Sequence, residues 1–376
     1  MKRIINHIAD FSSLGGIQTY LYSLCNSYPL DHKIYNISNK VLDIYNNKNK
    51  PFNYIYLFSF KFLFTQNKQT FVIHNLILSK KWLIIYLLLK IKRCEIIYHE
   101  HGIAWYDPIV NKSKYAKRVS KLNKIIVNSN ATALLIRNLY EIKNELKVLR
   151  SPVIIYEELS EKKYSKSINF VTKKNHKIKI GFIGRLAFHK NPFFLIEVAE
   201  LLIKKYDLEV ELNFVGSGPL SKLLEKYCKE NNINSIFFGR LENRRPALSN
   251  WNFCIVPSIR EPLGLVPGEM ALFDTLTFSS KVDGLKEMYP EECDILLIDM
   301  IKKNEANNPN IQYLPKLNKF DKNFYPDKEQ CAEKIFNLNK NEILYKNLLE
   351  KHKHFIKSKF NISTHSRKLK SFAFNL

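Results

Sequence analysis

No two of the six cysteines stand in a CxxC spacing, because they are scattered along the chain at Cys25, Cys94, Cys228, Cys254, Cys293 and Cys331. This pattern excludes a zinc ribbon, argues against a disulfide framework and suits a reduced cytosol. The chain also lacks an uncharged apolar run of the roughly eighteen residues that a membrane-spanning helix requires. Its first residues, MKRIINHIADFSSLGG, carry polar residues where a signal peptide needs an apolar stretch. These absences predict a cytoplasmic protein.

Acidic residues are few relative to basic ones, with 35 Asp and Glu against 59 Lys and Arg and a net charge of +24. Such a charge implies an anionic partner, which could be a nucleic acid, a phosphorylated small molecule or an acidic membrane surface. The lysines are dispersed along the whole chain, and no RNP, helix-turn-helix or zinc pattern is present. We therefore predict no nucleic-acid partner and expect most lysines to form a solvated surface.

Strands and helices are predicted in alternation through both halves of this 376-residue chain, which is longer than one ordinary core. In the first half RIINHIA, TFVIHNL and CEIIYHEHG read as strands, and NATALLIRNLY reads as a helix opened by an Asn cap. The polar segment 151–177 reads as the end of the first domain and a linker, and the alternation restarts at IKIGFIGRL. This pattern predicts an α/β protein with two Rossmann-like, doubly wound domains, residues 1–160 and 177–345, facing a ligand cleft.

Two glycines, Gly15 and Gly16, lie in SSLGGIQTY between the first predicted strand and the first predicted helix. Glycines there let the backbone approach a ligand, and the helix N-terminus offers N–H groups to a phosphate. A plain strand-to-helix turn explains them equally well. The pattern is neither GxGxxG nor a Walker sequence, so nicotinamide binding is disfavoured.

Two cations, Arg185 and Lys190, lie five residues apart in FIGRLAFHKNP, where a predicted strand ends. Cations that converge at the carboxyl edge of a parallel sheet neutralise a diphosphate well. The alternative is two surface cations in a chain that has 59 of them. Another glycine turn follows a strand in FVGSGP, and we place its Gly216 with the predicted donor-binding residues.

Two histidines, His99 and His101, end a predicted strand in YHEHGIAW. Their spacing would suit a metal ion, but no cysteine or carboxylate cluster nearby completes a site. We therefore predict no metal site. A lone histidine is more often structural than catalytic, although the carboxyl edge of a sheet improves the odds of a role in chemistry.

The most informative stretch is REPLGLVPGEM, residues 260–270, in which Glu261 and Glu269 stand eight positions apart across two glycines and two prolines. It directly follows the apolar strand NFCIVPS. A surface loop does not need two carboxylates placed across a stiff turn, because ordinary polar residues would serve there.

Taken in order, the motifs LGGIQ, HEHG, GRLAFHKN, VGSGP and PSIREPLGLVPGEMAL resemble those of the retaining, GT-B-fold nucleotide-sugar glycosyltransferases of group 1 (family four). The resemblance runs from about residue 1 to 299, and its most specific part is the paired-glutamate motif E-x7-E. It implies that the basic segment 346–376 is a helix crossing back to the first domain.

The resemblance also implies roles for the residues of the paired-glutamate turn. Glu261 is expected to hydrogen-bond hydroxyls of the donor sugar, and Glu269 to hold the ribose. The turn itself is expected to bind the diphosphate through backbone N–H groups at a helix N-terminus, those of Leu263, Gly264 and Leu265.

By the same resemblance, Arg185 and Lys190 neutralise the leaving diphosphate, which Gly16 and its neighbour Gly15 face from the first domain. His101 is expected beside the reacting sugar and the acceptor. Because cations and amides serve the diphosphate, no metal or other cofactor is predicted besides the UDP- or GDP-sugar donor. The acceptor implied is a growing glycan or a polyprenyl-diphosphate-linked lipid, in bacterial surface polysaccharide synthesis.

Two stretches depart from the family pattern: FDTLTFSS, residues 273–280, lacks a usual glycine and proline, and Asp283 replaces one of a usual glycine pair. Such changes affect sugar selectivity or weaken an enzyme. The alternatives that remain are a nucleotide-sugar epimerase of the same architecture and, from another class, a basic nucleic-acid-binding protein. The paired glutamates favour transfer over epimerisation.

The segment SKKWLIIYLLLKIKR, residues 79–93, has eight consecutive apolar residues bracketed by cations. It is too short to span a bilayer but suits a helix that lies at an anionic interface. Its position between two predicted strands favours instead a buried crossover helix. The positive charge and a lipid-linked acceptor lead us to predict a peripheral protein on the inner face of the plasma membrane, which binds anionic lipid through the first domain and the basic C-terminal helix.

Overall fold

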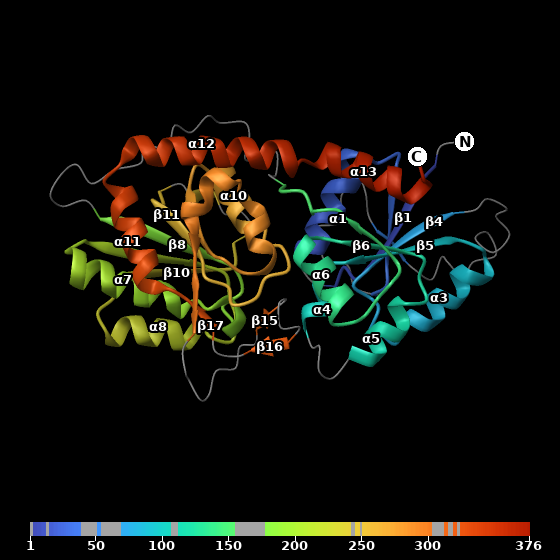
Figure 1. Cartoon of the computed structure of the whole chain (residues 1–376), viewed down its shortest axis with the longest axis horizontal. Helices are drawn as coiled ribbons and strands as arrows, with labels where there is room; N and C mark the ends of the chain where they lie inside the picture. The colour runs from blue at the N-terminus through green and yellow to red at the C-terminus, as the bar shows by residue number, and fades with distance from the viewer. Residues whose placement is uncertain are drawn as a thin grey trace. The chain divides into compact units, whose positions relative to one another are not determined.

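The computed structural model describes residues 3–12, 15–38, 51–53, 69–106, 112–154, 177–241, 245–248, 250–302, 312–314, 319–321 and 324–376. The chain divides into two compact units (Figure 1). The N-terminal unit consists of Met1–Ile154 and Phe360–Leu376, and the C-terminal unit is Ile155–Lys359. Most of the predicted linker, residues 155–176, lies outside the described residues.

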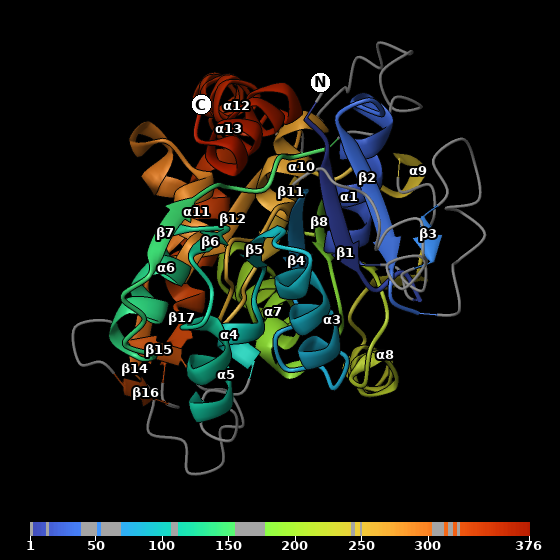
Figure 2. The same ribbon diagram turned by 90° about the vertical axis from the view of Figure 1, so that its right-hand side faces the viewer.

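The N-terminal unit contains a seven-stranded parallel sheet in the order β3-β2-β1-β4-β5-β6-β7 (Figure 2). Its central strands are buried along their whole length, as expected when helices cover both faces of a parallel sheet. The strands are β1 (Ile5–Ala9), β2 (His32–Asn36), β3 (Phe52–Asn53), β4 (Thr70–His74), β5 (Glu95–Glu100), β6 (Lys124–Val127) and β7 (Glu145–Val148).

Among the described residues, the helices of this unit are α1 (Gly16–Ser27), α3 (Trp82–Ile91), α4 (Ile103–Tyr106), α5 (Lys112–Val119), α6 (Asn130–Asn138) and α13 (Ile362–Phe374). The prediction of an Asn cap for α6 was wrong by one residue. The cap is Ser129, whose extended backbone lets its hydroxyl accept the N–H of Thr132 at 3.0 Å. Asn130 is the first residue inside the helix.

The C-terminal helices differ from the single crossover helix predicted for 346–376. Helix α12 (Glu342–Lys359) belongs to the C-terminal unit and α13 to the N-terminal unit. The helix is interrupted because Asn361 has an extended backbone and caps α13, its side chain accepting the Thr364 N–H at 2.8 Å. Leu369 and Phe372 of α13 then join the apolar core of the N-terminal unit.

The C-terminal unit is built on a six-stranded parallel sheet in the order β10-β9-β8-β11-β12-β13. Helices α7 and α8 lie on one side of it and α10 and α12 on the other (Figure 1). The strands are β8 (Ile178–Ile183), β9 (Val210–Val215), β10 (Ser235–Gly239), β11 (Phe253–Val256), β12 (Leu276–Ser280) and β13 (Leu297–Ile298).

The remaining elements of this unit cover the sheet and its ends. The helices are α7 (Phe193–Tyr206), α8 (Ser221–Glu230), α9 (Arg245–Leu248), α10 (Val266–Leu272) and α11 (Lys328–Asn339), with the 3-10 turns η4 (Phe188–Lys190), η5 (Asp283–Met288) and η6 (Glu291–Leu296). Two antiparallel pairs complete it: β14 (Met300–Lys302) with β17 (Phe324–Pro326), and β15 (Gln312–Leu314) with β16 (Lys319–Asp321). Within the described part of the chain, none of the helices combines the length and the apolar character that crossing a bilayer needs.

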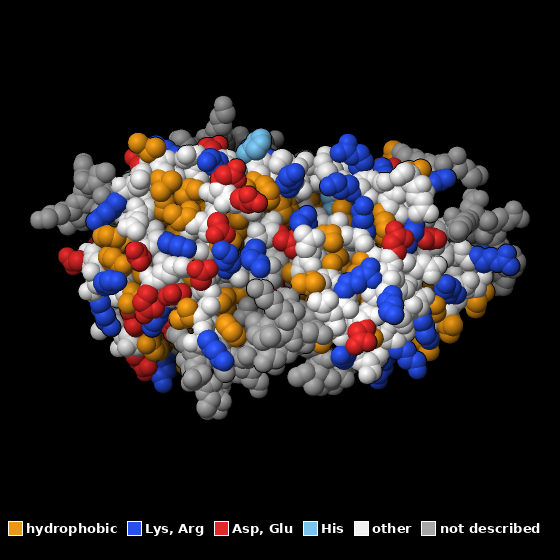
Figure 3. Space-filling model, viewed as in Figure 1, with side chains coloured by type: hydrophobic (Ala, Val, Ile, Leu, Met, Phe, Trp, Pro, Cys, Tyr) orange, Lys and Arg blue, Asp and Glu red, His pale blue; other side chains and the backbone are white. Residues whose placement is uncertain are grey.

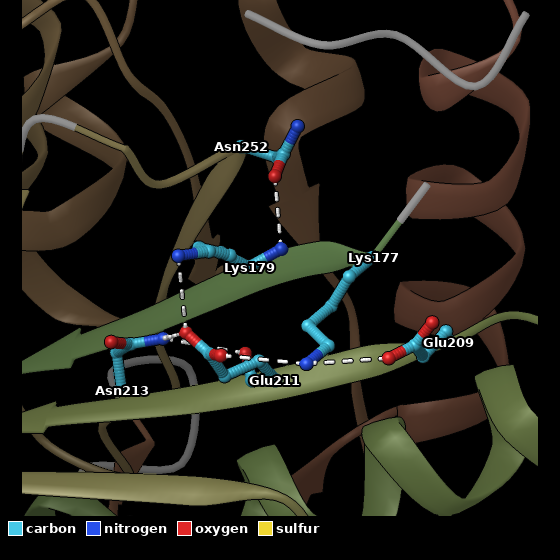
Figure 4. A network of polar contacts seen from close by, with 6 residues as sticks. All are labelled: Lys177, Lys179, Glu209, Glu211, Asn213 and Asn252. Carbon is cyan, nitrogen blue, oxygen red and sulfur yellow. Dashed lines mark hydrogen bonds and ion pairs between the residues drawn. The ribbon is translucent and has the colours of Figure 1, made fainter. Parts of the chain in front are cut away.

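A polar network ties β8 to β9 near their amino-terminal ends (Figure 4). The carboxylate of Glu211, which is 8% exposed, pairs with Lys177 at 3.8 Å and Lys179 at 3.4 Å. The side-chain amide of Asn213 donates to the same carboxylate at 3.2 Å. This network therefore stabilises the amino-terminal edge of the sheet. The predicted donor-binding loops lie at the opposite edge, after the carboxyl ends of the strands.

Candidate functional site

The carboxyl ends of β8 and β9 continue into two loops that lie side by side. The N–H of Gly184 donates to the carbonyl of Val215 at 3.0 Å, and that of Leu186 donates to Ser217 at 3.1 Å. Gly216 has φ 134°, and a Cβ there would lie 1.9 Å from the carbonyl oxygen of Gly184. Only glycine therefore fits at this predicted site residue.

Lys190 and Glu261, two of the predicted catalytic residues, are in direct contact. Lys190 ends η4, and its Nζ forms an ion pair with Oε2 of Glu261, to which Ser258 Oγ also donates at 3.2 Å. The two paired side chains are 25% and 12% exposed. Lys190 is expected to bind the diphosphate and Glu261 the sugar, so the groups expected to bind these two parts of the donor lie next to each other. Ser258 was not foreseen as part of this group.

Arg185 lies on the loop after β8 and is exposed. The positive charges of Arg185 and Lys190 both act on the imidazole of His189, on the same loop. Burial, followed by the charge of Lys190, lowers the pKa of His189 to about 4, and the charge of Arg185 acts in the same direction. His189 is therefore neutral at pH 7, and the loop is cationic through Arg185 and Lys190.

The backbone of Glu261 is held by the turn that follows β12. Its N–H donates to Oδ2 of Asp283 at 3.0 Å, and its carbonyl accepts the N–H of Gly284 at 3.1 Å. Asp283 has φ 38°, in the left-handed region, and a Cβ on Gly284 would lie 2.0 Å from the Pro262 oxygen. This backbone explains why the family usually has a glycine pair here. Aspartate can replace one of the two glycines because it tolerates the left-handed region.

Asp283 is thus a positioning residue rather than a plain departure from the family pattern. Burial raises the pKa of its carboxyl group to about 7, while the hydrogen bond from the Glu261 N–H lowers it. The sequence signals Asp283 only as an unusual residue, because nothing local links it to Glu261. The contact arises where the turns after β11 and β12, neighbouring strands, meet.

The turn between the two glutamates is tightly packed. Gly264 has φ 76°, and a Cβ on it would lie 2.7 Å from Glu261 Cγ. Helix α10 starts after Leu265, with Glu269 half-buried in its first turn. Among the described residues, nothing accepts the backbone N–H groups of 263–265. The resemblance implies that these groups bind the diphosphate.

In the N-terminal unit, Gly15 is the N-cap of α1 with an extended backbone, φ −163°. A Cβ on Gly15 would meet only the end of the flexible Gln18 side chain, at 2.8 Å. A Cβ on Gly16 would meet nothing within 4 Å among the described residues. Packing among the described residues therefore does not require a glycine at either position.

His101 follows β5 and is hydrogen-bonded on several sides. The backbone N–H of His101 donates to Oδ1 of Asn75 at 3.0 Å, and its backbone carbonyl accepts from Nδ2 of Asn128 at 3.2 Å. Its ring Nε2 lies 2.9 Å from Nδ1 of His74. Burial lowers the pKa of His101 to about 3, and the neighbouring His365 adds to this. His101 is therefore a neutral imidazole at pH 7, with its ring orientation fixed.

A chain of imidazoles leads away from His101 across neighbouring strands. His74 Nε2 lies 2.9 Å from Nδ1 of His7, whose Nε2 lies 3.0 Å from Nδ1 of His32, and His32 Nε2 lies 3.0 Å from Ser366 Oγ. The sequence pattern did not reveal this chain. Its only signal is a histidine in each of four segments predicted or found as strands, and the strand order brings them together.

The sequence of the chain matches a known protein family and several known proteins. The family described as "Glycosyl transferases group 1" matches residues 164–355, just over half of the 376-residue chain. The chain is 28% identical over 136 residues to a Campylobacter jejuni alpha-1,4-N-acetyl-D-galactosaminyltransferase that acts on a diNAcBac-PP-undecaprenol-linked glycan, covering 36% of this chain and 38% of that protein. It is 33% identical over 111 residues to Protein CapJ of Staphylococcus aureus, covering 27% and 26%. These matches span well under half of the curated relatives.

Solved structures resemble the whole chain. Anabaena HepE, in complex with UDP and glucose, aligns with a TM-score of 0.71 at 13% identity and covers 100% of both chains. The lipopolysaccharide outer core galactosyltransferase WaaB aligns with a TM-score of 0.67 at 14% identity and covers 99% of both. At such identities the likeness shows the fold alone, and it confirms the predicted α/β architecture of two Rossmann-like domains, GT-B. On the match to its family, the chain is a member of the group 1 glycosyl transferases.

Proposed function

We propose that this protein transfers a sugar, with retention of configuration, from a UDP- or GDP-sugar to a glycan or polyprenyl-diphosphate-linked acceptor. The observation that carries the proposal is the ion pair between Lys190 and Glu261, the first glutamate of the tightly packed paired-glutamate turn. The proposal draws support from the C. jejuni relative, whose name describes an undecaprenol-linked acceptor, and from HepE, which was solved with UDP.

In this mechanism the leaving diphosphate carries most of the charge that develops. The N–H groups of 263–265 donate to it, and Lys190 and Arg185 neutralise it. Glu261 binds sugar hydroxyls while the anomeric carbon gains oxocarbenium character. The acceptor then attacks from the face that the diphosphate leaves, and the acceptor proton passes to the departing phosphate oxygen. The sequence contains no Asp-x-Asp motif, and these cations and amides serve the diphosphate without a divalent ion.

A nucleotide and donor screen tests the proposal. UDP or GDP is expected to raise the melting temperature, whereas a single-stranded oligonucleotide of equal charge is not. Incubation with UDP- and GDP-sugars should release free sugar and nucleoside diphosphate slowly in the absence of acceptor. Recovery of an epimerised sugar nucleotide would instead identify an epimerase. Stabilisation by the oligonucleotide alone would identify a nucleic-acid-binding protein.

Arg185 and Lys190 are expected to act together on the diphosphate. Replacing either by Ala should weaken UDP or GDP binding about 10- to 100-fold, the effect of removing a charged hydrogen bond of roughly 1.5–3 kcal/mol. The double replacement should cost less than the sum, because both cations share one ligand group. Calorimetric titration with the nucleoside di- and monophosphate measures both effects.

The control for this experiment is Lys204→Ala, since the Lys204 side chain is 77% exposed on α7. It should bind both nucleotides as the wild type does. Losses of equal size for the monophosphate and the diphosphate would contradict the assignment of Arg185 and Lys190 to the diphosphate.

We also propose that the protein docks on an anionic membrane, at the cytoplasmic face, through α3. The helix buries Trp82, Ile85 and Leu89, as the crossover interpretation expected. Its other side is nevertheless apolar and exposed, with Leu83 51%, Ile84 57%, Leu87 50% and Ile91 77% exposed. Hydrophobic side chains show on the surface where α3 lies, beside Lys and Arg side chains (Figure 3).

The arrangement of these residues suits an interface. The exposed apolar positions 83, 84, 87 and 91 recur at helical spacing, so they form one stripe. Lys80, Lys90 and Arg93 are exposed at the two ends of the helix, where they would meet anionic headgroups. Apolar insertion and charge attraction would therefore act on the same surface.

Ile84→Glu is expected to weaken binding to anionic vesicles about tenfold, because it places a charge in the apolar stripe. Cosedimentation with phosphatidylglycerol and phosphatidylcholine vesicles, at low and high salt, measures this. The control is Leu223→Glu, at a residue 52% exposed on α8 of the other unit. Wild-type binding that ignores salt or vesicle charge, or that Ile84→Glu leaves unchanged, would remove the membrane from the proposal.

A further inference from the structure

Three histidines meet at the carboxyl ends of β4 and β5, where the sequence predicted no metal site. One ring nitrogen each of His74, His99 and His101 lies within 4.8 Å of the others. The ring centroids of His99 and His101 are 3.9 Å apart, and that of His74 is 5.2 Å and 5.1 Å from them. His74 and His99 are register partners on neighbouring strands, so the sheet itself sets their spacing.

His99 is the residue whose surroundings most directly indicate a ligand site. It is 0% exposed, yet neither of its ring nitrogens has a hydrogen-bond partner among the described residues. A neutral imidazole has one N–H and one lone pair, and proteins rarely bury such groups unpaired. A lone pair held next to two other imidazoles is a ready metal ligand.

His74 and His101 have the spacing that such a site needs. Nδ1 of His74 and Nε2 of His101 are 2.9 Å apart. Two histidine nitrogens on one tetrahedral zinc ion are separated by about 3.3 Å, given Zn–N bonds of about 2.0–2.1 Å. A small outward shift would therefore replace their hydrogen bond by two metal bonds.

The other ring nitrogen of His74 is already bound to a second layer of residues. His74 Nε2 lies 2.9 Å from His7 Nδ1, and His7 is held in turn by His32, 3.0 Å away. Metal-ligating histidines usually donate their second ring N–H to an acceptor, which fixes the tautomer and the ring orientation, and the imidazole of His7 can be that acceptor. The chain of imidazoles thus supports His74 as a ligand.

From these contacts we propose that His74, His99 and His101 form a three-histidine site for Zn²⁺ or another imidazole-preferring transition ion. Magnesium and calcium are excluded as occupants, because they prefer oxygen ligands. The nearby carboxylate of Glu100 accepts the hydroxyls of Tyr98 at 2.8 Å and Tyr115 at 2.7 Å, so it is engaged away from the site. The fourth position falls to water or an exogenous anion.

Occupancy of this site has a consequence that rests on the proposed function. A metal ion on His101 adds positive charge next to a residue expected beside the reacting sugar, where positive charge develops during transfer. Zinc is therefore an inhibitor of transfer, while transfer itself proceeds without it. Binding of zinc does not depend on that function, so the two are measured separately.

Titration of the metal-free full chain with ZnCl₂ tests the site directly. We expect saturable binding of one zinc ion per chain, no binding of MgCl₂, and a cobalt spectrum with tetrahedral bands but no thiolate charge-transfer band. His99→Leu removes one ligand without leaving an unpaired polar group, and it should weaken binding at least tenfold while the melting temperature of the metal-free protein does not fall. His354→Ala, at an exposed histidine of α12, is the matched control and should bind as the wild type does.

A second variant keeps the test decisive if His99→Leu folds poorly. His7→Phe removes only the support of His74, and it should weaken zinc binding about 10- to 100-fold. Equal zinc affinity in wild type and in both variants, or no saturable binding in the wild type, would overturn the site. Zinc that binds but does not inhibit a transferase would overturn the inhibition alone. Saturable zinc binding by a protein whose metal-free form turns over no sugar nucleotide would refute the proposed function and leave the site standing.

Discussion

Replacing Glu261 by glutamine is expected to lower kcat at least about 100-fold, the usual cost of losing a group that stabilises transition-state charge. Glutamine keeps the size of the side chain and can still accept from Ser258 Oγ, 3.2 Å away in the wild type. It loses the negative charge that holds Lys190 and that faces a sugar ring gaining positive charge. The loss should therefore fall on turnover rather than on folding.

Stability should change little in this variant. The paired Lys190 and Glu261 side chains are 25% and 12% exposed, so Lys190 can turn to water when its partner is neutral. Water and salt weaken such a pair, and we expect a loss in free energy of unfolding below about 1 kcal/mol. Thermal unfolding checks this expectation alongside the kinetics.

Two matched variants isolate the effect. Glu225→Gln neutralises an exposed carboxylate of α8 and should leave kcat unchanged. Glu269→Gln should raise the Kd for the free nucleotide more than it lowers kcat, because a ribose contact is made equally in ground and transition states. Wild-type kcat in Glu261→Gln, measured on the true donor at saturation, would sink the assignment of Glu261.

Much of the fold follows from local patterns in the sequence. A continuous apolar run such as FCIV predicts a buried strand, and the structure has it as β11, buried along its whole length in the parallel sheet. The details that differ depend on single backbone positions. The interruption between α12 and α13 depends on the extended backbone of Asn361, which an otherwise helical and basic segment does not signal.

The candidate site divides along the same line. The paired-glutamate motif lies within one stretch, residues 260–270, and its resemblance to the family motif implies the helix start that the structure shows as α10. The contact of Lys190 with Glu261 needs β8 and β11 to be neighbours, and the contact of Asp283 with Glu261 needs β11 beside β12. The histidine chain depends in the same way on the order β2-β1-β4-β5. Strand order is a property of the whole sheet, which local patterns do not contain.

Gly216→Ala is expected to destabilise the C-terminal unit by about 3 kcal/mol, at the upper end of ordinary single substitutions. Two costs add at this position. The backbone has φ 134°, a region that is essentially restricted to glycine, and the new Cβ would lie 1.9 Å from the Gly184 carbonyl oxygen. Because that oxygen belongs to backbone, the loops after β8 and β9 must move apart.

A nearby glycine provides the control for strain without a clash. Gly239 has φ 64°, in the left-handed region, and a Cβ there would meet nothing within 4 Å among the described residues. Gly239→Ala should therefore cost only about 1–2 kcal/mol. Both positions lie on the same edge, since the Gly216 N–H donates to the Gly239 carbonyl at 2.8 Å.

The separation of these loops should also weaken ligand binding. Arg185 directly follows Gly184, so a displaced loop carries the cation away from the expected position of the diphosphate. Hydrogen exchange of the amides in β8 and β9 gives the local stability, and calorimetry with UDP and GDP gives the binding loss. Gly216→Ala should lose both protection and nucleotide affinity, whereas Gly239→Ala should lose some protection and keep its affinity. If the two variants exchange and bind alike, the close packing of the β8 and β9 loops does not shape the donor site, and the assignment of Gly216 to it is wrong.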